Sequence, residues 1–162
     1  MRRTVVLGTV VTLVALAGCS ALSPTGAPLL TVDNQDDAEY RLTVYALSDP
    51  GDADGLRFLA TDAEGDNRSV EAAALRGNTS FRNVTLDADS DVTSQEVIRA
   101  GSTTTAAINI WESGDTTVYL IETADETASL VGAQVVTCGS RDQEHALTVS
   151  NGTISGRSVT CP

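Results

Sequence analysis

Lysine is absent from this 162-residue sequence, and all ten basic residues are arginines. Schiff-base chemistry needs a lysine amine, and the Walker phosphate loop needs a lysine beside its glycines. No glycine-rich dinucleotide loop follows an apolar strand either. The sequence therefore excludes lysine-dependent catalysis and P-loop nucleotide binding.

Histidine occurs once, as His145. A blue-copper site needs two histidines, and a zinc site would have to draw on Cys138 and Cys161, which are expected to be bridged. A Ser-His-Asp triad could use only His145, and no G-x-S-x-G turn accompanies it. We expect His145 on the surface beside a hairpin, and we assign no catalytic residue, no metal site and no cofactor.

Aromatic residues are few, which disfavours an aromatic glycan- or peptide-binding face. Most lie in segments that alternate between apolar and polar residues, so packing in the core is the expected role. The six are Tyr40, Tyr45, Phe58, Phe81, Trp111 and Tyr119.

The sequence also lacks an apolar run long enough to cross a membrane. A membrane-spanning helix needs about 20 residues, and the run from Thr4 to Leu16 is shorter. This run follows Arg2-Arg3 and leads to Ala17-Gly18-Cys19, the layout of a secretory signal. Leu16-Ala17-Gly18-Cys19 resembles the lipobox, which implies a lipoprotein signal peptide over residues 1–18 and a lipid on Cys19. An ordinary signal with an incidental cysteine is the alternative. The paired arginines also resemble a twin-arginine signal, with general secretion as the other route.

Removal of the signal leaves eight arginines against 22 acidic residues, a net charge of −14. Such a chain repels nucleic acid and anionic headgroups, so we expect no nucleic-acid partner and membrane attachment only through the lipid on Cys19. Residues 19–28 comprise the lipidated cysteine and a short tether, in which the nine residues 20–28 span roughly 15–18 Å as a flexible coil. Residues 29–162 form one domain, expected on the outer face of the cell membrane.

The acidic, lysine-free composition, rich in Ala, Val and Thr, resembles that of secreted lipoproteins from extremely halophilic archaea. Molar salt shortens the Debye length to about 3 Å, which screens the self-repulsion of such a chain.

Four asparagines lie in N-x-S/T sequons, which fits an exported glycoprotein, although a Thr-rich chain also makes sequons by chance. The candidate N-glycosylation sites are Asn67, Asn78, Asn83 and Asn151.

Short alternating segments separated by turn residues predict an all-β fold: an antiparallel β-sandwich, immunoglobulin-like in architecture, with about seven to nine strands. Trp111 precedes both downstream cysteines, so the specific immunoglobulin cysteine–tryptophan signature is missing. We expect strands over residues 29–33, 40–47, 56–61, 81–86, 96–99, 103–111, 116–123, 133–138, 146–150 and 153–157.

Local signals add three more specific expectations. Residues 103–111 and 116–123 flank a tight turn and are predicted to form a β-hairpin. Asn151-Gly152 predicts a second, two-residue hairpin. Residues 69–77 form the best helix candidate, with Ser69 as N-cap, although a strand is an alternative.

Cys138 and Cys161 are an even pair in an exported chain, so we predict a disulfide that ties the final hairpin to the strand before Cys138. Free thiols or a metal site are the alternatives.

Asp87-x-Asp89-x-Asp91 mimics the first ligands of a calcium loop, but Val92 and Ile98 stand where glycine and glutamate are needed. These aspartates are a weak calcium candidate against a solvated acidic loop, and Asp49 to Asp54 is weaker still.

The leading hypothesis is therefore a non-enzymatic, lipid-anchored surface module that contacts an unidentified protein or envelope partner. A small-ligand or calcium-binding accessory lipoprotein is the alternative. A carboxylate-dependent hydrolase stays open because nearby acid pairs are unavoidable among 22 acidic residues.

Overall fold

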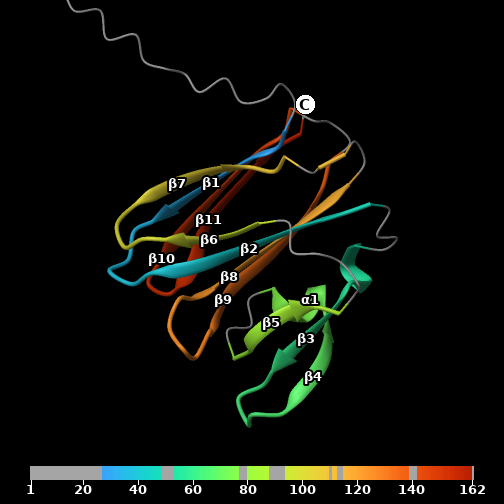
Figure 1. Cartoon of the computed structure of the whole chain (residues 1–162), viewed down its shortest axis with the longest axis vertical. Helices are drawn as coiled ribbons and strands as arrows, with labels where there is room; N and C mark the ends of the chain where they lie inside the picture. Colours follow the sequence, from blue (N-terminus) through green and yellow to red (C-terminus); the bar gives the residue numbers. More distant parts are fainter. Residues whose placement is uncertain are drawn as a thin grey trace, which may run out of the picture.

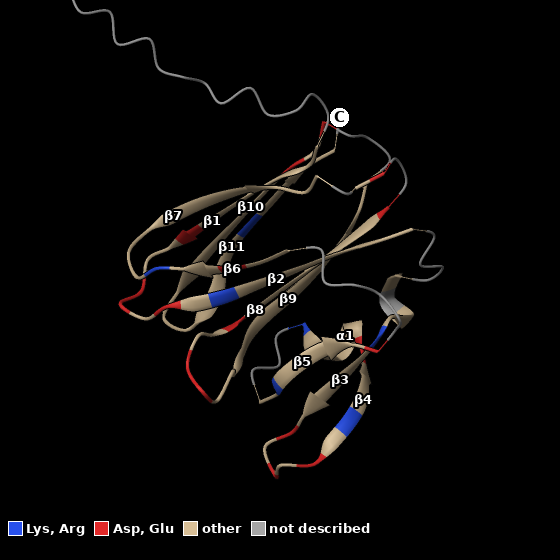
Figure 2. Ribbon diagram, viewed as in Figure 1, with Lys and Arg blue, Asp and Glu red and all other residues tan. Residues whose placement is uncertain are grey.

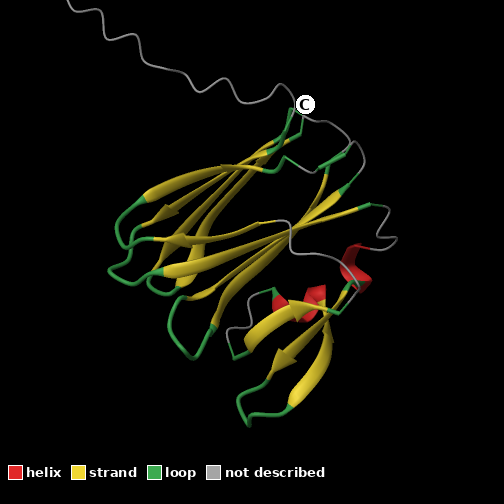
Figure 3. Ribbon diagram, viewed as in Figure 1, coloured by secondary structure: helices red, strands yellow, loops and turns green. Residues whose placement is uncertain are grey.

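The computed structural model describes residues 27–48, 53–76, 80–87, 94–109, 111–112, 115–138 and 142–161. These residues form three β-sheets, two of them packed face to face and the third against the outer face of the second (Figure 1). The first sheet has the strand order β11-β10-β1-β7, the second β6-β2-β8-β9 and the third β4-β3-β5. Figure 3 shows how little of the described chain is helical.

The elements are β1 (Leu29–Asn34), β2 (Tyr40–Leu47), the 3₁₀ turn η1 (Ala53–Gly55), β3 (Arg57–Thr61), β4 (Asn67–Glu71), α1 (Ala72–Leu75), β5 (Arg82–Leu86), β6 (Ser94–Ile98), β7 (Thr103–Ala107), β8 (Thr116–Thr123), β9 (Leu130–Thr137), β10 (Glu144–Ser150) and β11 (Thr153–Thr160).

The main core lies between the first and second sheets. Alternation places every second side chain of each strand on this inner face. The first sheet contributes residues such as Leu30 and Leu147, and the second contributes Leu42 and Ile121, all at most 2% exposed. All six aromatic side chains are buried, so the expectation that they pack in the core is confirmed.

A second core fills the space between the outer face of the second sheet and the third sheet. Phe58 and Leu75 come from the third-sheet side and meet Val118 and Leu120 of β8. As a result β8 is buried on both faces, and seven of its eight residues are buried. A near-continuous apolar strand is expected only where both faces are covered.

The predicted all-β, sandwich-type fold is confirmed. Two sheets of four strands form the sandwich, within the expected number, and the third sheet adds three further strands. The pairing is antiparallel throughout the described strands except between β1 and β10, which run parallel with Leu29 beside Glu144.

The predicted hairpin between residues 103–111 and 116–123 is wrong. β7 ends at Ala107 and pairs with β1 in the first sheet, whereas β8 pairs with β2 and β9 in the second. Between them the chain crosses the sandwich, with Ile108 and Trp111 buried in the main core. Alternation identifies each strand but not its partner. Here the burial of Ile108 and Trp111 between the two sheets accompanies the placement of β7 and β8 in different sheets.

The predicted helix is shorter than expected. Residues 67–71 form β4, paired with β3, and only Ala72–Leu75 is helical. Because Ser69 lies inside the strand, its hydroxyl does not cap the helix: it contacts Arg57 and the carboxylate of Asp87. Sheet pairing has therefore overridden the local helix signal.

The Asn151-Gly152 hairpin is confirmed, and it joins β10 to β11. Both turn residues have positive φ, 54° and 67°. The Asp36 carboxylate accepts hydrogen bonds from the Asn151 N–H at 2.6 Å, the Gly152 N–H at 2.9 Å and the Tyr40 hydroxyl at 2.6 Å. These donors lower the pKa of Asp36, while burial and the Asp36 contact raise the pKa of Tyr40 to about 12.

Gly132 lets β11 pack closely against β9. A Cβ at this position would lie 2.5 Å from Cδ1 and 2.9 Å from Cγ1 of Ile154. We expect Gly132→Ala to destabilise the domain by about 1–2 kcal/mol, because the core would be overpacked. Ile154→Val should recover part of the loss in the double variant. Equal unfolding midpoints for the wild type and Gly132→Ala in urea would contradict this packing.

In the part of the chain that the structure describes, no helix is long and apolar enough to cross a membrane.

Candidate functional site

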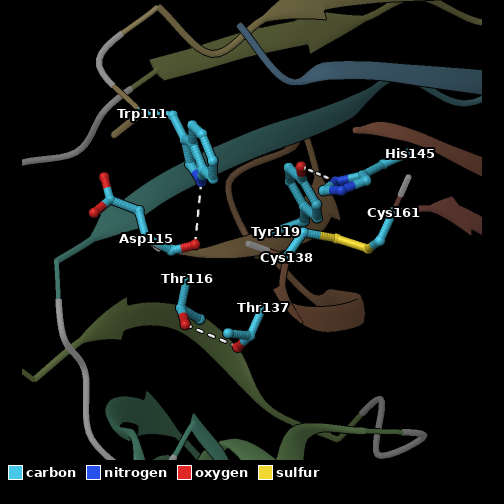
Figure 4. Close-up of a disulfide and its surroundings, with 8 residues drawn as sticks. All are labelled: Trp111, Asp115, Thr116, Tyr119, Thr137, Cys138, His145 and Cys161. Carbon is cyan, nitrogen blue, oxygen red and sulfur yellow. Dashed lines mark hydrogen bonds between the residues drawn. A yellow bond between two sulfur atoms is a disulfide. The ribbon is translucent and has the colours of Figure 1, made fainter. Parts of the chain in front are cut away.

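Cys138 and Cys161 are joined by the predicted disulfide (Figure 4), with their Cα atoms 5.8 Å apart. Cys138 follows β9 at one edge of the second sheet, and Cys161 follows β11 at one edge of the first. The bond therefore fixes the final hairpin to β9 and links the two sheets of the sandwich.

His145 is buried, with only 2% of its surface exposed, so the expected surface position is wrong. It lies on β10 in the same alternating series as Leu147 and Val149, which both face the main core. Its Nδ1 forms a hydrogen bond with the hydroxyl of Tyr119 on the opposite sheet, and the rings meet edge to face (Figure 4). Its Nε2 is buried without a partner.

Burial lowers the pKa of His145 to about 4, against an ordinary value of 6.5. Between these values the unfolded chain binds a proton that the folded chain does not, so stability falls as the pH falls. We expect about 2 kcal/mol of stability to be lost between pH 7.5 and pH 5. Urea unfolding at both pH values measures the effect.

His145→Gln is the control for this pH dependence, because its side chain is polar but does not titrate. Its stability should be nearly the same at pH 7.5 and pH 5. The pKa values of Asp33, Asp36, Asp62 and Asp125 are lowered by hydrogen bonds, so these aspartates titrate below this range. An equal loss of stability in His145→Gln would assign the effect to other groups.

The weak calcium candidate is only partly described. The Asp87 carboxylate accepts a hydrogen bond from the Ser69 hydroxyl at 3.0 Å, and Asp89 and Asp91 lie outside the described residues. Among the described residues, no three His, Cys, Asp or Glu side chains are grouped to hold a metal ion. Calcium binding by this segment stays a prediction.

The candidate modification sites also divide between described and undescribed parts. Asn67, Asn83 and Asn151 are exposed, and Asn83 and Asn151 have positive φ. Asn78 and Cys19 lie outside the described residues. Glycosylation and lipidation therefore stay predictions.

A cleft between β2, β5 and β6 is the site that the sequence did not reveal. Its volume is about 160 Å³. Residues of β2, β5 and β6 line it, and β8 contributes the buried carboxylate of Glu122. The lining residues are Arg41, Thr43, Tyr45, Asn83, Val84, Thr85, Gln95 and Glu122.

An ion pair between Arg41 and Glu122 lies at the bottom of this cleft. Nη2 of Arg41 donates to Oε2 of Glu122 at 2.9 Å, and Oε1 of Glu122 accepts the backbone N–H of Val84 at 2.8 Å. The Glu122 side chain is 3% exposed and the Arg41 side chain 29%. A buried carboxylate is costly unless it is paired and hydrogen-bonded, and here the carboxylate of Glu122 links β8 to β2 through Arg41 and to β5 through Val84.

The rest of the cleft offers hydrogen bonds. The amide of Gln95 donates to the hydroxyl of Thr43 at 3.2 Å. Nε of Arg41 is buried without a partner. The arrangement can bind a polar group through hydrogen bonds, and the one carboxylate of its lining, Glu122, is already paired with Arg41.

One sequence signal could have pointed to this site. Glu122 ends the apolar run Val118–Ile121. A charged residue at the end of such a run needs a partner when the strand is buried. The residues that satisfy it are 81 and 38 positions away along the chain, which no local pattern shows.

Figure 2 shows many acidic residues of the sandwich in its connecting loops and a basic residue on β2, and the one arginine of this strand is Arg41. Two facing sheets of four strands, crossed by the chain and joined by a disulfide, define an immunoglobulin-like β-sandwich.

The chain belongs to a family described as Halobacterial Ig domain protein, whose model matches residues 1–162. This match confirms the halophilic and immunoglobulin-like parts of the sequence prediction. No curated protein and no solved structure matches the chain.

Proposed function

We propose that the protein is a lipid-anchored, extracytoplasmic interaction module without enzymatic activity, held on the outer face of the cell membrane. The observation that carries the proposal is the short distance along the chain between the lipobox cysteine and the sandwich. β1 begins at Leu29, ten residues after Cys19. A domain tied so closely to a lipid stays within tens of ångströms of the membrane surface.

The topology supports a tether at one particular end of the sandwich. Leu29 pairs with Glu144, and Glu144 pairs with Thr160, so the start of β1 and the end of β11 lie at one end. The opposite end carries the β1–β2, β8–β9 and β10–β11 turns. These turns face away from the membrane in the proposed arrangement and stay accessible to a partner.

Fractionation of cells that express the wild type or Cys19→Ser tests the anchor. The wild type should be in the membrane fraction as a chain that begins at Cys19 and carries a lipid adduct in mass spectrometry. Cys19→Ser should appear in the medium. The matched control is Cys161→Ser, which loses a different cysteine and should stay with the membrane. Membrane retention of Cys19→Ser, or an unmodified Cys19, would contradict the proposal.

A further inference from the structure

We propose that the cleft between β2, β5 and β6 binds a carboxylate presented by a partner protein, as an acidic side chain or a chain terminus. This inference gives a chemical class to the partner of the interaction module proposed above. Three features of the cleft carry it: the N–H donors that Arg41 does not use, the size of the cleft and the free strand beside it.

Arg41 is the cation of the cleft lining and Glu122 its anion, so the lining carries no net charge and the N–H donors of Arg41 carry the inference. An arginine has five N–H donors, and the contact with Glu122 uses one of them. Each oxygen of Glu122 already accepts one hydrogen bond, one from Arg41 and one from the backbone of Val84. The cleft therefore has donors to spare, and a planar carboxylate is the group that a guanidinium binds best.

The size of the cleft limits the ligand to a single group. Sites for drug-sized ligands measure about 300–1,000 Å³, and this cleft measures about 160 Å³. One acidic side chain or one chain terminus fits this space. Two of the cleft's β2 residues are buried, because Thr43 and Tyr45 are 4% and 3% exposed. The guanidinium itself is held in place by Glu122.

The neighbouring strand offers a place for the rest of the partner. β6 is the edge strand of the second sheet, and no described strand pairs with its outer side. Val97 lies on β6 opposite Arg41 and is 57% exposed, the most exposed of the large apolar side chains described. A free edge with an exposed aliphatic residue favours contact with another backbone.

Labelled pentapeptides test the inference by fluorescence anisotropy in molar KCl. The probe is acetyl-Val-Thr-Glu-Thr-Val-amide, whose one carboxylate is a side chain. The Gln analogue lacks a carboxylate, and the Gln analogue with a free C-terminus carries only a terminal one. We expect at least one carboxylate peptide to bind about tenfold more tightly than the neutral peptide. The two carboxylate peptides show whether a side chain or a terminus is preferred.

Arg41→Lys keeps the positive charge but loses the planar fork, so it should weaken binding of that peptide about tenfold. Arg157→Lys makes the same substitution on the exposed surface of β11 and should leave binding unchanged. If Arg41→Lys does not fold, NMR of the wild type is the second test. The amide chemical shifts that change when the peptide is added should then belong to β2, β5 and β6. Equal binding of charged and neutral peptides, unchanged binding in Arg41→Lys, or shifts centred elsewhere would overturn the inference. None of these results would affect the test of Cys19 lipidation.

Discussion

Replacing Cys161 by serine is expected to lower the free energy of unfolding by about 3.5 kcal/mol. The two cysteines are 23 positions apart, and closing a loop of this length restricts the unfolded chain by about that amount in the chain-entropy model. Cys161 is exposed, so the serine itself should cost little, whereas Cys138 is 2% exposed and a poorer choice for substitution.

Urea unfolding with and without a reductant measures the contribution of this disulfide. Dithiothreitol should destabilise the wild type by a similar amount and should leave Cys161→Ser unchanged. If the variant and the oxidised wild type unfold at the same urea concentration, the bond does not stabilise the domain.

Replacing Glu122 by alanine should cost about 3 kcal/mol. The change leaves Arg41 without its carboxylate and the N–H of Val84 without its acceptor, and breaking one side of a buried pair typically costs 3–5 kcal/mol. Because the Arg41 side chain keeps 29% exposure, water can compensate part of its charge. This places the expected value at the lower end of the range.

Glu122→Gln separates the charge from the hydrogen bonds. Its amide oxygen can still accept from Val84, so the loss should be smaller, about 1–2 kcal/mol. The Arg41→Met/Glu122→Ala double variant should be more stable than the sum of the two single losses predicts, because neither charge is then left alone. Strict additivity in urea unfolding would show that the two side chains do not interact.

Much of the fold could be predicted from the sequence because strand signals are local. The alternation from Tyr40 to Leu47 places Leu42 and Val44 on one face, and both are buried in the main core. The Asn151-Gly152 turn needs positive φ at two adjacent residues, and few other dipeptides allow it. These features depend on residues that are neighbours along the chain.

Strand partners and layers depend on distant residues and were harder to predict. β7 and β8 alternate as a hairpin would, yet burial of Trp111 between the sheets sends them to opposite sides of the sandwich. The third sheet was missed for a related reason. Phe58 and Leu86 indicate strands, but nothing in their spacing shows that they cover a face of another sheet.

Some features of the candidate site could be predicted from the sequence, and others depend on residues that are far apart along the chain. The pairing of Cys138 with Cys161 follows from their number and from the expected export. The position of His145 could have been found from its register with Leu147 and Val149. The pairing of Arg41 with Glu122 could not, because it forms only after β2 and β8 have become neighbours.

Because β8 faces a core on each side, the third sheet cannot be removed by deletion. A chain that lacked β3, β4 and β5 would expose Val118 and Leu120 on the outside of an otherwise complete sandwich. Apolar patches of this kind promote aggregation in soluble proteins. A two-sheet relative of this protein would therefore need polar residues at alternate positions of β8, and that substitution pattern would distinguish the two architectures in a new sequence.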